Sequence, residues 1–149
     1  MDLNTLIKIN KKNFDIKFKK LLYKKLDKSN LSKAIYYGSI NGGKRIRPFL
    51  TMESAKIANI SANDAFIISS SIECIHSYSL IHDDLPSMDD DTIRRGKPST
   101  HIKFGEATAI LAGNSLLTMA FEILSHKDLK VSTKAVSYTH LTLPTILLV

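Results

Sequence analysis

Five aspartates fall within residues 83–91, and Arg94 and Arg95 follow almost at once. They come directly after a mostly apolar segment, residues 62–84, whose pattern predicts a helix that Pro86 ends. Burial of ionisable side chains on an apolar helix costs free energy unless that helix borders a polar cavity. The chain must therefore fold so that the C-terminal end of this helix opens onto such a cavity. The alternative is an ordinary solvated acidic loop, and the paired arginines argue against it.

The same charges suit one kind of ligand, a metal-bound diphosphate. Mg²⁺ prefers carboxylate oxygens and is usually held by one or two carboxylates together with substrate phosphate oxygens and water. Arginine side chains can bind the phosphate oxygens that the metal leaves free. His76 and Asp83 are two helical turns apart, so we expect both on one face of the predicted helix, with Glu73 and Leu80 in the same stripe.

A second group of basic residues follows a glycine turn, in the segment Gly42-Gly43-Lys44-Arg45-Ile46-Arg47-Pro48. Two glycines let the backbone approach a ligand closely and adopt unusual φ angles. Lys44 and Arg47, three positions apart, can point the same way at the start of a helix. This pattern predicts an anion site. Alone it is weak evidence, because basic turns are commonly just solvated.

Helical patterns cover nearly the whole chain. We predict helices over residues 4–27, 31–37, 48–58, 62–84 and 105–125, with a turn that opens at Gly38 and continues through Gly42 and Gly43. No convincing segment alternates apolar and polar residues, so the expected fold class is all-α. With 149 residues, of which 44% are hydrophobic, the chain is long enough for one domain or a piece of one.

The net charge of +7 does not indicate nucleic-acid binding. Nine lysines and two aspartates lie between residues 8 and 28, which accounts for the whole excess and describes the solvated face of a surface helix. A single cysteine and the lack of an N-terminal signal pattern favour a cytoplasmic protein. The apolar segment 107–124 is interrupted by polar residues, so we expect a core helix there and no membrane span.

Taken together, these motifs resemble those of the trans-isoprenyl diphosphate synthases, the polyprenyl synthetase family. The resemblance runs from about residue 37 to residue 124, in the order and spacing of the family, and rests on residues 42–48, 73–86, 89–91 and 94–98. It implies the N-terminal part of an isoprenoid-synthase helical bundle. It also implies a Mg²⁺-dependent trans-prenyltransferase that joins an allylic diphosphate, dimethylallyl or geranyl, to isopentenyl diphosphate, commonly as a homodimer.

The resemblance also implies roles for individual residues. Asp83 and Asp89 match Mg²⁺ ligands, Asp84 matches a residue that supports them, and all three count as catalytic residues together with Arg94. Arg94 matches a residue that contacts the allylic diphosphate. The isopentenyl diphosphate site is expected to contain Lys44, Arg47, His76 and Arg95.

Tyr78, five residues before Asp83, matches the position of a bulky side chain that stops the growing prenyl chain. With the spacing from Asp83 to Asp89, it resembles the bacterial farnesyl type, so farnesyl diphosphate is the expected product. On sequence alone, an ordinary core tyrosine is about as good an explanation. A geranylgeranyl product and a non-catalytic synthase-like binding subunit are the alternatives, and the basic glycine turn argues against a terpene cyclase.

The end of the chain departs from the family pattern. We expect residues 1–135 to be the N-terminal portion of an incomplete polyprenyl synthetase domain, because no second aspartate-rich motif follows. Residues 136–149 break the helical pattern and resemble a translated sequencing-adapter sequence, so we expect a non-native tail. The fragment alone is then expected to be inactive. A natural apolar C-terminal tail is the alternative.

Overall fold

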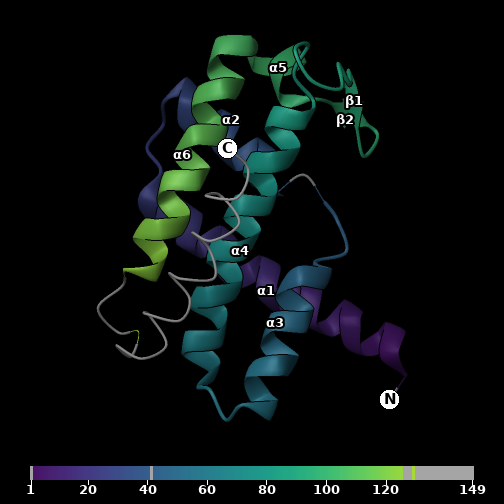
Figure 1. The fold of residues 1–149 in the computed structure, drawn as a ribbon, viewed down its shortest axis with the longest axis vertical. Helices are drawn as coiled ribbons and strands as arrows, with labels where there is room; N and C mark the ends of the chain where they lie inside the picture. The colour runs from purple at the N-terminus through teal and green to yellow at the C-terminus, as the bar shows by residue number, and fades with distance from the viewer. Residues whose placement is uncertain (1, 41, 126–128, 130–149) are drawn as a thin grey trace.

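The computed structural model of the protein describes residues 2–40, 42–125 and 129. Its described part is built from helices, with one short hairpin at one end (Figure 1). The elements are α1 (Leu3–Lys25), α2 (Asn30–Ile40), α3 (Ile46–Ile57), α4 (Ala62–Asp83), β1 (Ile93–Arg94), β2 (Lys97–Pro98), α5 (Thr100–Phe104) and α6 (Glu106–Leu124). The predicted all-α fold class is confirmed.

Helix α4 organises the core. It packs against α6 on one side and against α3 on another, and α2 contacts both α4 and α6 (Figure 1). Small residues at the centre of α6, including Ala109, Ala112 and Gly113, are buried and allow a close approach to α4. The apolar core that results extends to Phe14, Phe18 and other buried residues of α1.

Helix α6 is long and apolar enough to cross a membrane by length and composition alone. A core helix passes the same test, and this helix buries its Leu116 and Ile123 within the protein core. Residues 107–124 thus lie in a core helix, as predicted, and the structure shows that this helix packs against α4.

The helix boundaries follow local signals at most positions. Ser61 caps α4, since its side chain accepts a hydrogen bond from the amide of Asp64 at 3.1 Å. At the start of α2, the side chain of Ser29 likewise accepts a hydrogen bond from the amide of Ser32. At the other end of α4, Asp83 is the last helical residue, so the aspartates lie across a helix C-terminus and the loop after it.

Two local predictions were wrong. Gly38 does not open a turn, because α2 continues to Ile40 and Gly38 lies against Ile81 and Thr100. Residues 93–98 form an antiparallel hairpin that was not predicted, in which Arg94 is opposite Lys97. Two-residue strands are too short to show an alternating pattern. The predicted boundary at residue 135 and the predicted tail lie outside the described residues.

Candidate functional site

Arg45 holds the glycine turn to the rest of the protein. Its backbone is left-handed, with φ 55°, and its side chain is buried. The guanidinium forms an ion pair with Glu73 of α4, donates to Asp15 of α1 at 2.8 Å and donates to the carbonyl of Ser39 at 2.9 Å. Burial raises the pKa of Glu73, and the charge of Arg45 opposes that shift. This network fixes where the turn lies beside α4.

Arg95 joins the glycine turn to the hairpin. Its Nη1 donates a hydrogen bond to the carbonyl of Gly42 at 2.7 Å. Gly43 has φ 98°, and a Cβ there would lie 2.5 Å from the same Nη1 atom. Both glycines are needed for backbone shape, and Gly43 is also needed for the close approach of the guanidinium. The two motifs, 53 positions apart, are therefore in direct contact.

His76 lies on α4 and is close to another cation, Arg47. Its Nε2 is 3.5 Å from Nη1 of Arg47. Burial and the positive charges of Arg47, Arg95, Arg45 and Arg94 lower the pKa of His76 to about 4. The imidazole is therefore neutral at physiological pH and adds a hydrogen-bonding group, without a further charge, to a cationic site.

Arg94 is anchored by Asp84. Its Nε lies 2.7 Å and 2.8 Å from the two carboxylate oxygens of Asp84, whose side chain is buried. This pairing raises the pKa of Arg94. None of the described residues accepts a hydrogen bond from Nη1 of Arg94, so that group remains available to a ligand. Asp84 thus orients the guanidinium of Arg94.

Asp83 and Asp89 are brought together by the turn after α4. The amide of Asp89 donates to the carbonyl of Asp83 at 2.9 Å. Neither carboxylate forms a hydrogen bond or an ion pair within the described part of the chain. Two unpaired carboxylates that flank one turn fit a hard cation such as Mg²⁺.

No three histidine, cysteine or acidic side chains among the described residues are close enough to hold a metal on their own. A magnesium ion at Asp83 and Asp89 would need its other ligands from a phosphate and from water, which is how Mg²⁺ is commonly bound.

The remaining predicted residues lie at the edges of this site. Lys44 is exposed and forms no ion pair with any described carboxylate. Tyr78 is half-buried, and its ring packs edge-on against His82, with the ring centroids 4.6 Å apart. Nε2 of His82 is 3.2 Å from the carbonyl oxygen of Ile110 on α6. Tyr78 thus lies where α4 meets α6, and not among the arginines.

Two residues with a structural role in the site were not predicted. Arg45 and Glu73 hold the turn and the helix together, whereas from the sequence Arg45 was expected only to be part of a basic motif. A signal was present, because Glu73 is three positions before His76 and so lies on the same helical face.

Three comparisons with known proteins bear on this site. A sequence model of the polyprenyl synthetase family matches residues 28–146. The farnesyl diphosphate synthase of Escherichia coli (strain K12) is 56% identical over 93 residues, which are 62% of this chain and 31% of that protein. A geranylgeranyl pyrophosphate synthase 4 of Arabidopsis thaliana is 47% identical over 105 residues, 70% of this chain and 28% of that protein.

Among solved structures, an FPP/GFPP synthase from Zymomonas mobilis superposes with a TM-score of 0.84 and 35% sequence identity. The match covers 97% of this chain and 53% of that one. The chain spans about a third of the length of the curated relatives that it matches, 31% of the Escherichia coli protein. The family match covers most of the chain, and the chain belongs to the polyprenyl synthetase family.

Proposed function

We propose that the intact protein is a trans-prenyltransferase that joins an allylic diphosphate to isopentenyl diphosphate, and that this chain supplies its diphosphate-binding face. The observation that carries the proposal is the hydrogen bond from Arg95 to the carbonyl of Gly42. It joins two basic motifs, and Arg94, next to Arg95, binds Asp84, which follows the unpaired Asp83. Cations beside free carboxylates suit a magnesium diphosphate, because each charge type has a partner in that ligand.

On the allylic side, Asp83 and Asp89 would hold Mg²⁺ and Arg94 would bind phosphate oxygens through its free Nη1. Bound magnesium would balance the negative charge that builds up on the departing diphosphate. Asp84 keeps the guanidinium of Arg94 in one orientation, which lowers the entropy lost on binding. The positive charge of Arg94 stabilises the leaving group as the allylic C–O bond breaks.

On the isopentenyl side, Lys44, Arg47 and Arg95 would bind the second diphosphate, and neutral His76 would complete its hydrogen bonds. The double bond of isopentenyl diphosphate then attacks the allylic carbocation and forms the new C–C bond. The attack leaves a positive charge on the isopentenyl unit, and loss of a proton from the carbon next to that charge to the released diphosphate forms the new double bond. The arginines hold both substrates in the orientation that this step requires.

Farnesyl diphosphate is the product that we propose, with Tyr78 as the side chain that limits chain length. A geranylgeranyl product is the second candidate, and the Arabidopsis thaliana relative favours it. Tyr78 packs against His82 at the junction of α4 and α6, so its ring is fixed at one depth along α4. We also propose that the protein acts in the cytoplasm as a homodimer and that residues 1–135 are one portion of its catalytic domain.

Titration calorimetry of the 149-residue chain with inorganic diphosphate and Mg²⁺ tests the proposal. We expect saturable, Mg²⁺-dependent binding at millimolar ligand or below. Asp83→Asn/Asp89→Asn should abolish the Mg²⁺ dependence, whereas Asp90→Asn in the same loop should not. Asp90 is a suitable control because it is exposed and has φ 52°, which asparagine tolerates well. Equal effects of these variants, or no heat of binding, would overturn the proposal.

A further inference from the structure

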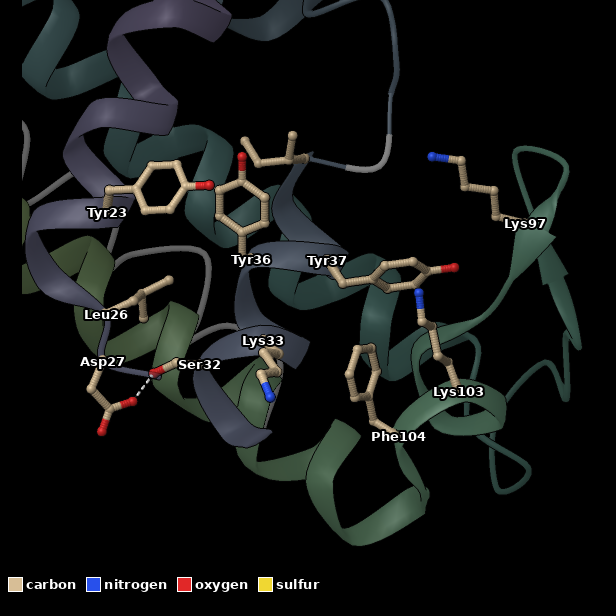
Figure 2. Close-up of a pocket in the computed structure, with 11 residues that line it drawn as sticks. Tyr23, Leu26, Asp27, Ser32, Lys33, Tyr36, Tyr37, Lys97, Lys103 and Phe104 are labelled. Carbon is tan, nitrogen blue, oxygen red and sulfur yellow. Dashed lines mark hydrogen bonds between the residues drawn. The ribbon is translucent and has the colours of Figure 1, made fainter. Parts of the chain in front are cut away.

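A cavity with its own set of lining residues borders the same hairpin as the proposed diphosphate site, since its Lys97 is opposite Arg94. It has a volume of about 530 Å³ and is bordered by α1, α2, β2 and α5 (Figure 2). This volume is in the range of small-molecule sites in proteins, about 300–1,000 Å³. None of the aspartates, arginines or histidines of the proposed catalytic site lines it.

One side of the cavity is apolar and aromatic. Leu26, Tyr23 and Tyr36 lie on this side, and the rings of Tyr23 and Tyr36 lie against each other with their centroids 5.2 Å apart (Figure 2). Ile40 also lines the cavity. Such a surface binds flat or branched apolar groups, because burial of the apolar surface of the ligand is favourable. Stacking between rings adds to the binding free energy.

The other side is cationic. Lys97 and Lys103 lie there, and the ammonium of Lys103 is 4.0 Å from the ring centroid of Tyr37 (Figure 2). Tyr37 is held in turn by a hydrogen bond from its hydroxyl to the carbonyl of Pro98 at 2.7 Å. Neither lysine forms an ion pair with a described carboxylate, so two positive charges at this end lack an anion.

Asp27, the one acidic residue of the lining, does not neutralise them. Its carboxylate accepts hydrogen bonds from the amide of Ser29 and the hydroxyl of Ser32, and these bonds lower its pKa to about 2. It lies at the far end from Lys97, next to Leu26 (Figure 2). The cavity therefore has an aromatic and apolar side with Asp27 at its far end, a cationic end at Lys97 and Lys103, and a third lysine, Lys33, between Ser32 and Phe104 (Figure 2).

We propose that this cavity is a second ligand site, which takes an organic phosphate monoester with an apolar body of one or two rings. The phosphate is expected to bind at the cationic end of the cavity, because lysine binds phosphate as a compact point charge. The body lies against Tyr36, Ile40 and Phe104. This site does not depend on the diphosphate site, so the proposed function can fail without affecting it.

The test is a titration of the 149-residue chain with naphthyl phosphate, followed by the fluorescence of the naphthyl group. We expect one saturable site with a dissociation constant of about 1 mM or tighter. Naphthol, which lacks the phosphate, and inorganic phosphate, which lacks the rings, should each bind at least about tenfold more weakly. Excess diphosphate with Mg²⁺ should not displace naphthyl phosphate.

Two variants locate the site. Lys97→Gln/Lys103→Gln should weaken binding by about tenfold or more. Lys8→Gln/Lys19→Gln removes the same charge from exposed positions of α1 outside the cavity, and should leave binding unchanged. NMR contacts between naphthyl protons and the rings of Tyr36 and Phe104 provide a readout that needs no variant. Absence of saturable binding, equal loss in both variants, displacement by diphosphate, or contacts elsewhere would each overturn the proposal.

Discussion

The ring of His82 occupies the space that a side chain at Gly113 would need. A Cβ built on Gly113 would overlap Nε2 and Cδ2 of this ring. The same ring lies edge-on to Tyr78 and reaches the carbonyl of Ile110. Gly113 therefore sets how closely α6 approaches α4 just beside the proposed site, and His82 links that approach to the position of Tyr78.

Gly113→Ala should destabilise the protein by about 1–3 kcal/mol, because the added methyl group must displace a partly buried ring. At an unobstructed helical position, the same change would stabilise by about 0.5–1 kcal/mol. Urea unfolding followed by circular dichroism measures the difference. In a His82→Ala background the ring is gone, and Gly113→Ala should then be neutral or stabilising. Equal destabilisation in both backgrounds would show that the ring is not the obstacle.

Arg45→Met should destabilise the protein by about 3–5 kcal/mol, since it leaves Glu73 buried without its partner. Arg45→Met/Glu73→Leu should cost less than Arg45→Met alone, because no unpaired charge remains in the interior. Lys44→Met is the matched control. It removes a neighbouring charge that is exposed, and should change the free energy of unfolding by about 0.5 kcal/mol or less. A loss in Arg45→Met no larger than in this control would contradict a stabilising role for the network.

Gly43→Ala should weaken diphosphate binding, and Gly42→Ala should affect it much less. Both glycines have positive φ, so both variants strain the backbone. Only the Cβ at residue 43 would collide with the guanidinium of Arg95, since the nearest atom to a Cβ at residue 42 is 3.9 Å away. Calorimetry should show a loss of about tenfold for Gly43→Ala, the value of one charge-assisted hydrogen bond. Equal losses would mean that backbone strain alone matters.

His76 should titrate in the folded protein with a pKa of about 4, below its ordinary value of 6.5. NMR of the imidazole protons measures this directly, and Arg47→Ala should move the midpoint upward. The sign for stability follows from proton uptake. Between these two values the unfolded chain binds the proton more readily, so stability should fall as pH falls from 6.5 towards 4. His76→Gln should remove that part of the pH dependence, and a midpoint near 6.5 would contradict the cationic surroundings.

Tyr78→Ala should lengthen the product. The test uses a hybrid enzyme in which residues 28–125 replace the corresponding segment of the Escherichia coli farnesyl diphosphate synthase. Removal of the ring opens space along α4 beyond the aspartates, so further isopentenyl units should add. Chromatography of the products measures chain length. Unchanged length, in a hybrid that remains active, would indicate that Tyr78 is a core residue only.

Much of this fold could be predicted because it depends on local signals. The apolar pattern of residues 62–84 and the stop at Pro86 placed both ends of α4 to within one residue. Gly38 was misread because its helical conformation is decided by packing against Ile81, which no local pattern reveals. Tertiary contacts decide such positions against propensity.

In the candidate site, too, some features could be predicted from local sequence signals and others depended on tertiary structure. Some of the residues that the sequence singled out are in contact: Arg95 with Gly42, Arg94 with Asp84, and Arg47 with His76 on α4. Which basic residue of residues 42–48 turns inward could not be predicted. The left-handed backbone of Arg45 directs its side chain into the interior, and leaves Lys44 exposed. The backbone conformation of this one residue therefore makes Arg45 a structural residue and leaves Lys44 as the candidate ligand-binding residue.

The hybrid enzyme tests the central claim most directly. With geranyl diphosphate, isopentenyl diphosphate and Mg²⁺ as substrates and cofactor, we predict formation of farnesyl diphosphate, and its loss in Asp83→Asn but not in Asp90→Asn. A hybrid that folds, as judged by circular dichroism and cooperative unfolding, yet forms no prenyl diphosphate would contradict the account.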